Sequence, residues 1–291
     1  MFYRRKIILS ILQIFNNKLE KIKLQKLLFL FTTYQKEKAY HFVPYKYGAY
    51  SFSAVADLRS LEKTGIVFSD KKFFYKKDTT DYTKDLTAQD AKILSSIKEY
   101  FFNFTKEDLI KFTYQNYPYY ATKSNIAKEY LHSNELEKHH NKDNKIILFT
   151  IGYEGISLEE YLNKLLQNNV SLLIDVRNNP ISMKYGFSKT KLSTYCKSLG
   201  IQYLHLPEAG IPSDHRKTLR KQDDYDKLFV WYKEHHLAKN NEVLQNIYSL
   251  LLHHKRIALT CFEANIHQCH RKHLAEQIAK LPNFEYPIVH L

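Results

Sequence analysis

The chain has 291 residues, of which 44 % are hydrophobic and 25 % charged, and a formal net charge of +14. This length and composition exclude a disordered polypeptide and leave room for one large or two ordinary domains. Three irregularly spaced cysteines exclude a disulfide framework, and no apolar run is long enough to cross a membrane. We therefore expect a cytoplasmic protein with reduced thiols and no membrane contact.

The positive charge is unevenly distributed. Residues 1–145 hold 26 Lys and Arg against 16 Asp and Glu, whereas residues 146–291 hold 18 against 14. The excess in the first half would support sequence-independent contacts to phosphates, so we expect DNA or RNA as a partner. A lysine-rich composition throughout the chain would give the same total without such contacts.

Residues 4 to about 130 show a largely helical pattern. "KIILSILQIFNN" and "IKLQKLLFLFTTYQ" have apolar residues three and four apart, which predicts a pair of helices with one buried stripe each. "YHFVPYKYGAYS" interrupts the period, and a third helix follows with Ser51 or Ser53 as N-cap and Gly65 as its stop. The strand "IVFS" and its hairpin partner "KKFFYKKD" come next. This order is typical of a winged helix-turn-helix.

The same stretch, roughly residues 6 to 70, resembles the SocA-like, Panacea-type antitoxin domains and their winged-helix relatives. Those show a K-L-Q-K-L-L helix followed by a Y-G-P motif, and this chain has "KLQKLLFLF" and then "YGA", with Ala49 at the usual proline. The resemblance implies a regulatory module that binds DNA or a protein partner. Tyr45, Tyr47 and Tyr50 are candidates to stack on bases. The structural alternative is that this tyrosine cluster beside a Pro-Gly turn forms core and a hydrogen-bonded rim. The candidate nucleic-acid contacts are Tyr45, Lys46, Tyr47, Lys71 and Lys72.

Two or three further helices are expected over residues 87–132, the first of them capped by Thr87. The polar segment "HSNELEKHHNKDNK", residues 132–145, is predicted to be a linker. We therefore expect a helical, winged-helix-like basic domain over residues 1–140 and a second domain over residues 146–291.

After residue 145, short apolar runs alternate with helical stretches. The runs lack the alternation of a half-exposed strand, so they predict strands buried on both faces of a largely parallel sheet. A Ser157/Glu160 capping box begins the first helix. The expected fold is a Rossmann-like α/β sheet flanked by helices. The five runs are "KIILFTIG", "VSLLIDVR", "IQYLHL", "RIALTCF" and "YPIVHL".

Polar residues follow four of these strands. Ligands of parallel sheets bind beyond the carboxyl ends of the strands, where the loops begin. The four ends read "TIGYEG", "DVRNNP", "HLPEAG" and "CFEANIHQCHR". We therefore expect one shared rim that contains Glu154, Asp175, Arg177, His205, Glu208, Glu263, Cys269, His270 and Arg271.

These motifs, T-I-G-x-x-G, D-V-R-x-x-P, H-L-P-E-x-G and C-x-E followed by C-H-R, resemble in the same order the domain of unknown function 488 family. The resemblance spans about residues 147–280. It implies a small α/β protein, sometimes likened to nucleic-acid-processing enzymes, with a site but no settled reaction.

Metal binding is one chemistry open to the rim. Cys261 and Cys269, with His267 and His270 nearby, provide the nitrogen and sulfur ligands that zinc prefers. The tight Cys-x-x-Cys spacing of structural zinc sites is absent, so we predict no metal ion and no cofactor. Cys261 on a buried strand is then a small apolar filler.

Nucleophilic catalysis and anion binding are two further chemistries open to the rim. Cys269 falls in the first turn of a helix, where backbone N–H groups stabilise a thiolate. The same helix start offers donors to a phosphate or carboxylate. The predicted phosphate ligands are Arg177, Arg271, Gly152 and His205, and the predicted catalytic groups are Glu263, Asp175, His270 and Cys269.

A structural alternative stays open. Asp175 with Arg177, and Glu263 with Arg271, would form salt bridges that tie loops together, because ion-pair networks resemble active sites.

Two functions from different classes follow. The first is a hydrolase or transferase acting at a phosphate or glycosidic group of a nucleic acid or nucleotide, docked by the basic N-terminal module. The second is a non-catalytic, antitoxin-like regulator whose α/β domain senses a small anion. The sequence fixes no oligomeric state.

Overall fold

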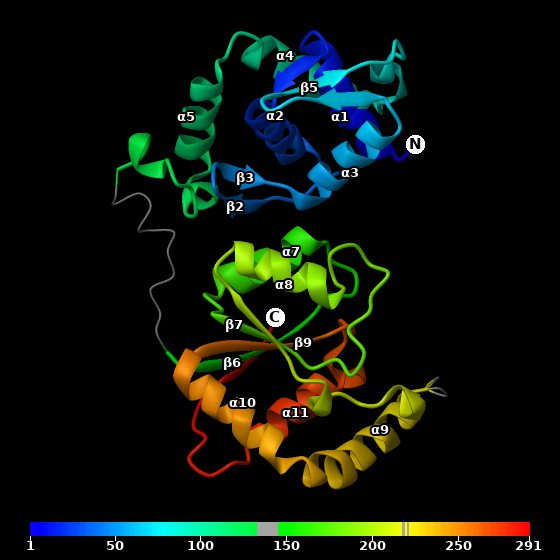
Figure 1. The fold of residues 1–291 in the computed structure, drawn as a ribbon, viewed down its shortest axis with the longest axis vertical. Helices are drawn as coiled ribbons and strands as arrows, with labels where there is room; N and C mark the ends of the chain where they lie inside the picture. Colours follow the sequence, from blue (N-terminus) through cyan, green and yellow to red (C-terminus); the bar gives the residue numbers. More distant parts are fainter. Residues whose placement is uncertain (133–144, 217–218, 220) are drawn as a thin grey trace. The chain divides into compact units, whose positions relative to one another are not determined.

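The computed structural model describes residues 1–132, 145–216, 219 and 221–291. The chain divides into two compact units, Met1–His140 and Asn141–Leu291, here called unit 1 and unit 2 (Figure 1). The predicted linker over residues 132–145 lies almost wholly outside the described residues.

Unit 1 is built on helices whose caps follow from the sequence. The Ser51 hydroxyl accepts a hydrogen bond from the backbone N–H of Ala54, and the Thr87 hydroxyl accepts one from that of Asp90, so both predicted N-caps are confirmed. Apolar residues of the first two helices form the centre of the core. The α-helices are α1 (Tyr3–Ile14), α2 (Lys21–Tyr34), α3 (Phe52–Lys63), α4 (Ala88–Phe101) and α5 (Lys106–Asn116).

Two small antiparallel sheets complete unit 1. The predicted hairpin is present as β4 (Val67–Ser69) paired with β5 (Phe73–Lys76). A third strand, β1 (Lys18–Glu20), pairs with the other edge of β5, and it is too short to carry a periodic signal in the sequence. A separate hairpin joins β2 (Val43–Tyr45) to β3 (Gly48–Tyr50). The winged-helix classification of this arrangement stays a prediction.

Unit 2 contains a five-stranded sheet in the order β10-β6-β9-β7-β8, in which every neighbouring pair is parallel. The predicted α/β fold with a largely parallel sheet is therefore confirmed, and all five apolar runs form strands. The central strands are buried along their whole length, which explains their unbroken apolar sequences. The strands are β6 (Ile147–Gly152), β7 (Leu172–Asp175), β8 (Gln202–His205), β9 (Arg256–Cys261) and β10 (Ile288–His290).

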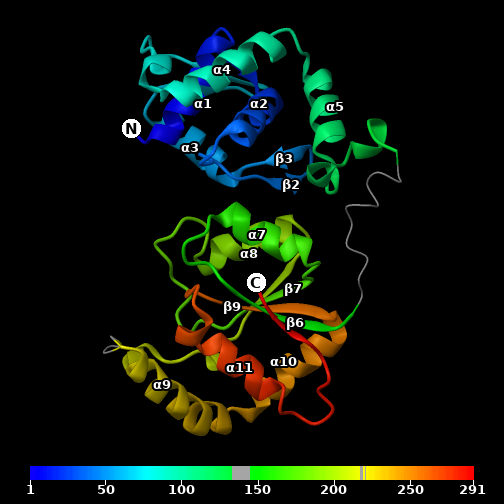
Figure 2. The same ribbon diagram turned by 180° about the vertical axis from the view of Figure 1, so that it is seen from behind.

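Helices cover both faces of this sheet (Figures 1 and 2). One face carries α7 (Leu158–Gln167), which begins at the predicted Ser157/Glu160 capping box, and α8 (Lys189–Ser198). The other carries α10 (Asn241–His254) and α11 (His270–Ile278). The insert between β8 and β9 also includes α9 (Gln222–Trp231), which continues into a π-helix over Tyr232–Leu237.

Within the described ranges, every helix is too short or too polar to traverse a lipid bilayer.

Candidate functional site

The carboxyl ends of three adjacent strands meet because of the sheet register. Gly152 at the end of β6 pairs with Cys261 at the end of β9, and Asp175 at the end of β7 pairs with Thr260. The loops that follow these strands therefore start side by side, as the parallel order predicts.

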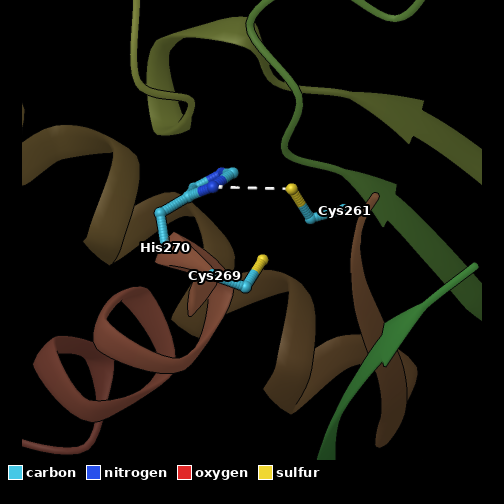
Figure 3. A group of neighbouring side chains, drawn as sticks. All are labelled: Cys261, Cys269 and His270. Carbon is cyan, nitrogen blue, oxygen red and sulfur yellow. Dashed lines mark hydrogen bonds between the residues drawn. The ribbon is translucent and has the colours of Figure 1, made fainter. Parts of the chain in front are cut away.

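The centre of this edge is the Cys261 thiol. Its Sγ lies 3.0 Å from Glu263 Oε2 and 3.5 Å from His270 Nδ1. Cys269, the N-cap of α11, brings its own sulfur to the same point, and the three side chains point toward one another (Figure 3). His270 is fixed from behind, because its Nε2 lies 2.9 Å from the Val176 carbonyl oxygen and donates to it.

The surroundings separate the two sulfurs chemically. Burial alone would raise the pKa of the Cys261 thiol. Three neighbours outweigh burial and bring that pKa well below its usual value: Cys269 through a hydrogen bond, His270, and Arg216 through its charge. Burial and the neighbouring Cys261 raise the pKa of Cys269 well above normal. Burial and Cys261 also raise the pKa of Glu263. The surroundings thus favour the thiolate at Cys261 and make Glu263 a weaker acid than an ordinary glutamate.

Arg216 completes the cluster from a 3-10 turn, Ser213–Arg216. Its guanidinium donates to Glu263 Oε1 at 3.0 Å and to His270 Nδ1 at 2.8 Å. Arg216 is not among the residues predicted for the site, because nothing in its local sequence pattern marks an arginine inside the insert between β8 and β9. The predicted partner of Glu263, Arg271, instead donates to the backbone carbonyls of Glu263 and Ala264.

A second, separate group forms at the end of β7. Asp175 is fully buried and accepts from Arg177 Nε at 2.8 Å and from the Tyr203 hydroxyl at 2.6 Å. Arg177 also donates to the Tyr153 hydroxyl at 2.7 Å. These contacts match the salt-bridge alternative for Asp175 and Arg177. Their predicted catalytic and phosphate-binding roles stay predictions.

Gly152 provides clearance for the β9 loop. A β-carbon at this position would stand 2.0 Å from the Glu263 carbonyl oxygen and 3.2 Å from Arg271 NH1. Glycine is therefore needed for the loop and α11 to approach the end of β6.

The remaining predicted rim residues lie at its edges. Glu154 accepts a hydrogen bond from the backbone N–H of Ala264, which ties the β6 loop to the β9 loop. His205 Nε2 lies 2.9 Å from the Arg177 carbonyl oxygen. Glu208 contributes its backbone carbonyl to His236. These three residues shape the loops around the thiol cluster without contacting Cys261.

A cavity of about 310 Å³ opens beside the cluster. Its lining includes Cys261, Arg177, Arg216 and Tyr153. Of the residues predicted for the rim, Arg177 is the one in this lining, whereas Glu263 and His270 are next to the lining residue Cys261. The other lining residues are Asn178, Asn179, Ile181, Ser182, Met183, Ile211, Ser213 and Phe262.

The same cluster has the ligand atoms for a soft metal ion. Cys261, Cys269 and His270 are buried and their ligand atoms lie within 4.8 Å of one another. The Nε2–Val176 hydrogen bond is the kind of outer contact that orients a metal-binding histidine. Against this, the Arg216 cation occupies the face of Nδ1 that a metal would need.

In unit 1, the predicted nucleic-acid contacts fall on two different hairpins. Tyr45, Lys46 and Tyr47 lie on the β2–β3 hairpin, and Lys71 and Lys72 lie in the turn between β4 and β5. The Tyr45 ring packs 4.8 Å from the Tyr50 ring, whereas Tyr47 is about half exposed at 48 %. Their role in binding stays a prediction.

Comparison with known families agrees with the rim motifs. Residues 157–278 match the family model described as Domain of unknown function DUF488. No curated protein and no solved structure matches the chain.

The DUF488 match contains β7, β8, β9 and the whole of α11, and therefore Arg216 and the whole Cys261 cluster. The T-I-G-x-x-G motif at the end of β6 lies before the matched residues, although the resemblance had been expected from residue 147. No match supports the expected SocA-like, Panacea-type module, which stays a prediction.

Proposed function

We propose that unit 2 is an enzyme that acts on a nucleic acid or nucleotide, at a phosphate or glycosidic group, with Cys261 as its nucleophile. The observation that supports this most directly is the position of Cys261 between Glu263 and His270, in the lining of a cavity that two arginines also line. A thiolate held in this way is a competent nucleophile at neutral pH.

In the proposed reaction, Cys261 acts as a thiolate and Glu263 carries the proton that the leaving group needs. The thiolate attacks the electrophilic phosphorus or sugar carbon, and the bond to the leaving group breaks with its electron pair. Glu263, as the acid, gives its proton to the leaving group. The resulting carboxylate then takes a proton from water, whose oxygen displaces the thiolate from the covalent intermediate and leaves Glu263 protonated again.

The two arginines of the cavity supply positive charge for an anionic substrate. Arg216 also contacts Glu263 and His270, so substrate binding and the orientation of the acid are linked through one guanidinium. The basic excess of residues 1–145 supports a role for unit 1 in holding the polymer.

The test is turnover of end-labelled single-stranded and duplex DNA, RNA and free nucleotides by the full chain. We expect Cys261→Ser and Glu263→Gln to abolish turnover while leaving the salt-dependent binding of random DNA unchanged. Cys196→Ala is the matched thiol control, because Cys196 is buried in α8, away from the cluster. Salt-dependent binding with no turnover of any of these substrates would favour the non-catalytic regulator instead.

A soft metal ion is the second candidate for the cluster, favoured by the three converging ligand atoms. Elemental analysis of the purified chain distinguishes the two. One equivalent of zinc or copper in the unaltered chain, and none in either Cys269→Ala or His270→Ala, would support a metal centre. The nucleophile proposal instead expects a metal-free protein with one rapidly alkylated thiol.

A further inference from the structure

Helix α2 of unit 1 buries a lysine. The sequence "LQKLLFLFT" is buried from Leu24 to Thr32 without a break, so Lys26 cannot extend to solvent as lysines on amphipathic helices do. Its side chain is 1 % exposed. Lysine is almost never fully buried unless it is paired, which makes this residue exceptional.

The amine of Lys26 has no hydrogen-bond partner within the part of the chain that the structure describes. Its closest favourable contact is the face of the Tyr114 ring, whose centroid lies 4.7 Å from Nζ. A buried ammonium that donates no hydrogen bond destabilises the fold. A ligand that accepts from Nζ would remove this cost.

The β2–β3 hairpin is shaped around the amine. Gly48 has a φ of +93°, and a β-carbon there would stand 2.2 Å from Lys26 Nζ and 2.6 Å from the Tyr114 ring. Both the backbone angle and the close approach require glycine. The turn therefore brings bare backbone against the lysine.

A cavity of about 370 Å³ lies at this point, and both Lys26 and Gly48 line it. Its size is that of a small-molecule pocket. Aromatic and aliphatic side chains make up much of the wall, including Tyr45, Tyr50 and Leu58. The charged lining residues other than Lys26 are Lys21, Lys46, Arg59 and Glu62.

We propose that this cavity binds a small organic acid whose carboxylate accepts from Lys26 Nζ and whose apolar body packs against Tyr45 and Tyr50. The basic side chains outnumber the single carboxylate of the lining, so the pocket favours an anion. This ligand site belongs to unit 1 and does not depend on the reaction proposed for unit 2.

The protonation of the amine supports the same ligand. Burial lowers the pKa of Lys26 to about 7, and no carboxylate among the described residues offsets the effect. A bound carboxylate raises that pKa again, so binding at neutral pH takes up a proton. The other titratable side chains that line the cavity or contact the amine are Lys21 of α2, Tyr45, Lys46, Tyr47 and Tyr50 of the β2–β3 hairpin, Arg59 and Glu62 of α3, and Tyr114 of α5.

The experiment titrates benzoate into the full chain by calorimetry at pH 7, in two buffers that differ in ionisation heat. Benzamide serves as the neutral isostere and inorganic phosphate as the compact anion. We expect saturable benzoate binding with uptake of roughly half a proton, because the site titrates near this pH. Benzamide should bind at least about ten times more weakly than benzoate because it has no charge. Phosphate should bind at least about ten times more weakly because it has no apolar body.

Lys26→Met should weaken benzoate binding at least about tenfold. Lys92→Met, an exposed position on α4 outside the cavity lining, should change it less than about twofold. NMR of ¹⁵N-labelled lysine side chains in the unaltered protein provides a readout that needs no variant. Benzoate should raise the titration midpoint of the Lys26 amine. Equal benzoate affinity in Lys26→Met, an unmoved midpoint, or phosphate binding as tight as benzoate would each overturn the proposal.

Discussion

Gly152 and Glu263 approach each other so closely that a β-carbon on Gly152 would stand 2.0 Å from the Glu263 carbonyl oxygen. Gly152→Ala should therefore push the β9 loop away from β6 and destabilise unit 2 by about 1–3 kcal/mol. Gly155→Ala is the control, because Gly155 has a φ of +77° but nothing near its β-carbon position, so it costs only the backbone strain, about 1 kcal/mol. Urea unfolding followed by Trp231 fluorescence reports on unit 2 alone, since the chain has one tryptophan. Equal effects of the two substitutions would refute the clearance argument.

The acidified Cys261 thiol should react selectively. A normal cysteine loses reactivity below its pKa of about 8.5, but Cys261 should keep most of its alkylation rate at pH 6.5 because its pKa is held down. Cys269, whose pKa is raised, should stay unlabelled. Mass spectrometry after brief iodoacetamide treatment of the native chain measures both. Preferential labelling of Cys269 would reverse the assignment of the nucleophile.

Arg216 should control that reactivity. Removing its charge in Arg216→Met deprives the Cys261 thiolate of a cation, so the pKa of Cys261 should rise. The pH profile of its alkylation should shift upward by about one pH unit, which slows the reaction by about tenfold on the rising limb of that profile. Lys227→Met removes a cation from the exposed surface of α9 and serves as the charge control. A rate in Arg216→Met equal to that of Lys227→Met would show that the guanidinium does not act on the thiol.

The ion pair of Asp175 and Arg177 can be assigned by substitution. If it is structural, Asp175→Asn leaves a buried guanidinium without its anion and should lower the free energy of unfolding by about 3–5 kcal/mol. Replacing both residues, in Asp175→Leu with Arg177→Met, should recover much of this loss. If Asp175 is a catalytic group as the sequence predicts, Asp175→Asn should instead fold with little loss of stability and lose turnover. Trp231 fluorescence in urea and the nucleic-acid assay separate these results.

Lys26 should make the stability of unit 1 depend on pH. Its pKa is about 7 in the folded chain, whereas an unfolded lysine titrates at about 10.4, so the unfolded state binds more protons between these values. Stability should therefore rise with pH, by about 2 kcal/mol from pH 7 to pH 9, and Lys26→Met should remove the rise. Urea unfolding by circular dichroism measures it, with the transition of unit 2 identified by Trp231. The same slope in Lys26→Met would contradict a low pKa at this amine.

The sequence predicted the sheet of unit 2 because its strands are long apolar runs separated by helical periods, and the parallel order then placed the four loops. It predicted Glu263 and His270 for the same reason. It did not predict Arg216, which reaches Cys261 through a turn whose position depends on how the insert between β8 and β9 folds. Cys261 is predicted to be filler because burial is common for a lone cysteine, and no sequence pattern reveals that this residue lines a cavity.

In unit 1, the N-caps and the β4–β5 hairpin could be predicted from local signals. The burial of Lys26 could not, since a helical wheel places lysine toward solvent. Only the packing of α5 and the β2–β3 hairpin over the same side of α2 encloses it.

The order of strands in unit 2 has a consequence for biosynthesis. Both partners of β6, namely β9 and β10, come much later in the chain. During translation the apolar segment Ile147–Gly152 therefore leaves the ribosome long before either neighbour exists. Until Arg256–Cys261 has emerged, this segment exposes two unpaired strand edges, which makes nascent chains of intermediate length the species most in need of a chaperone.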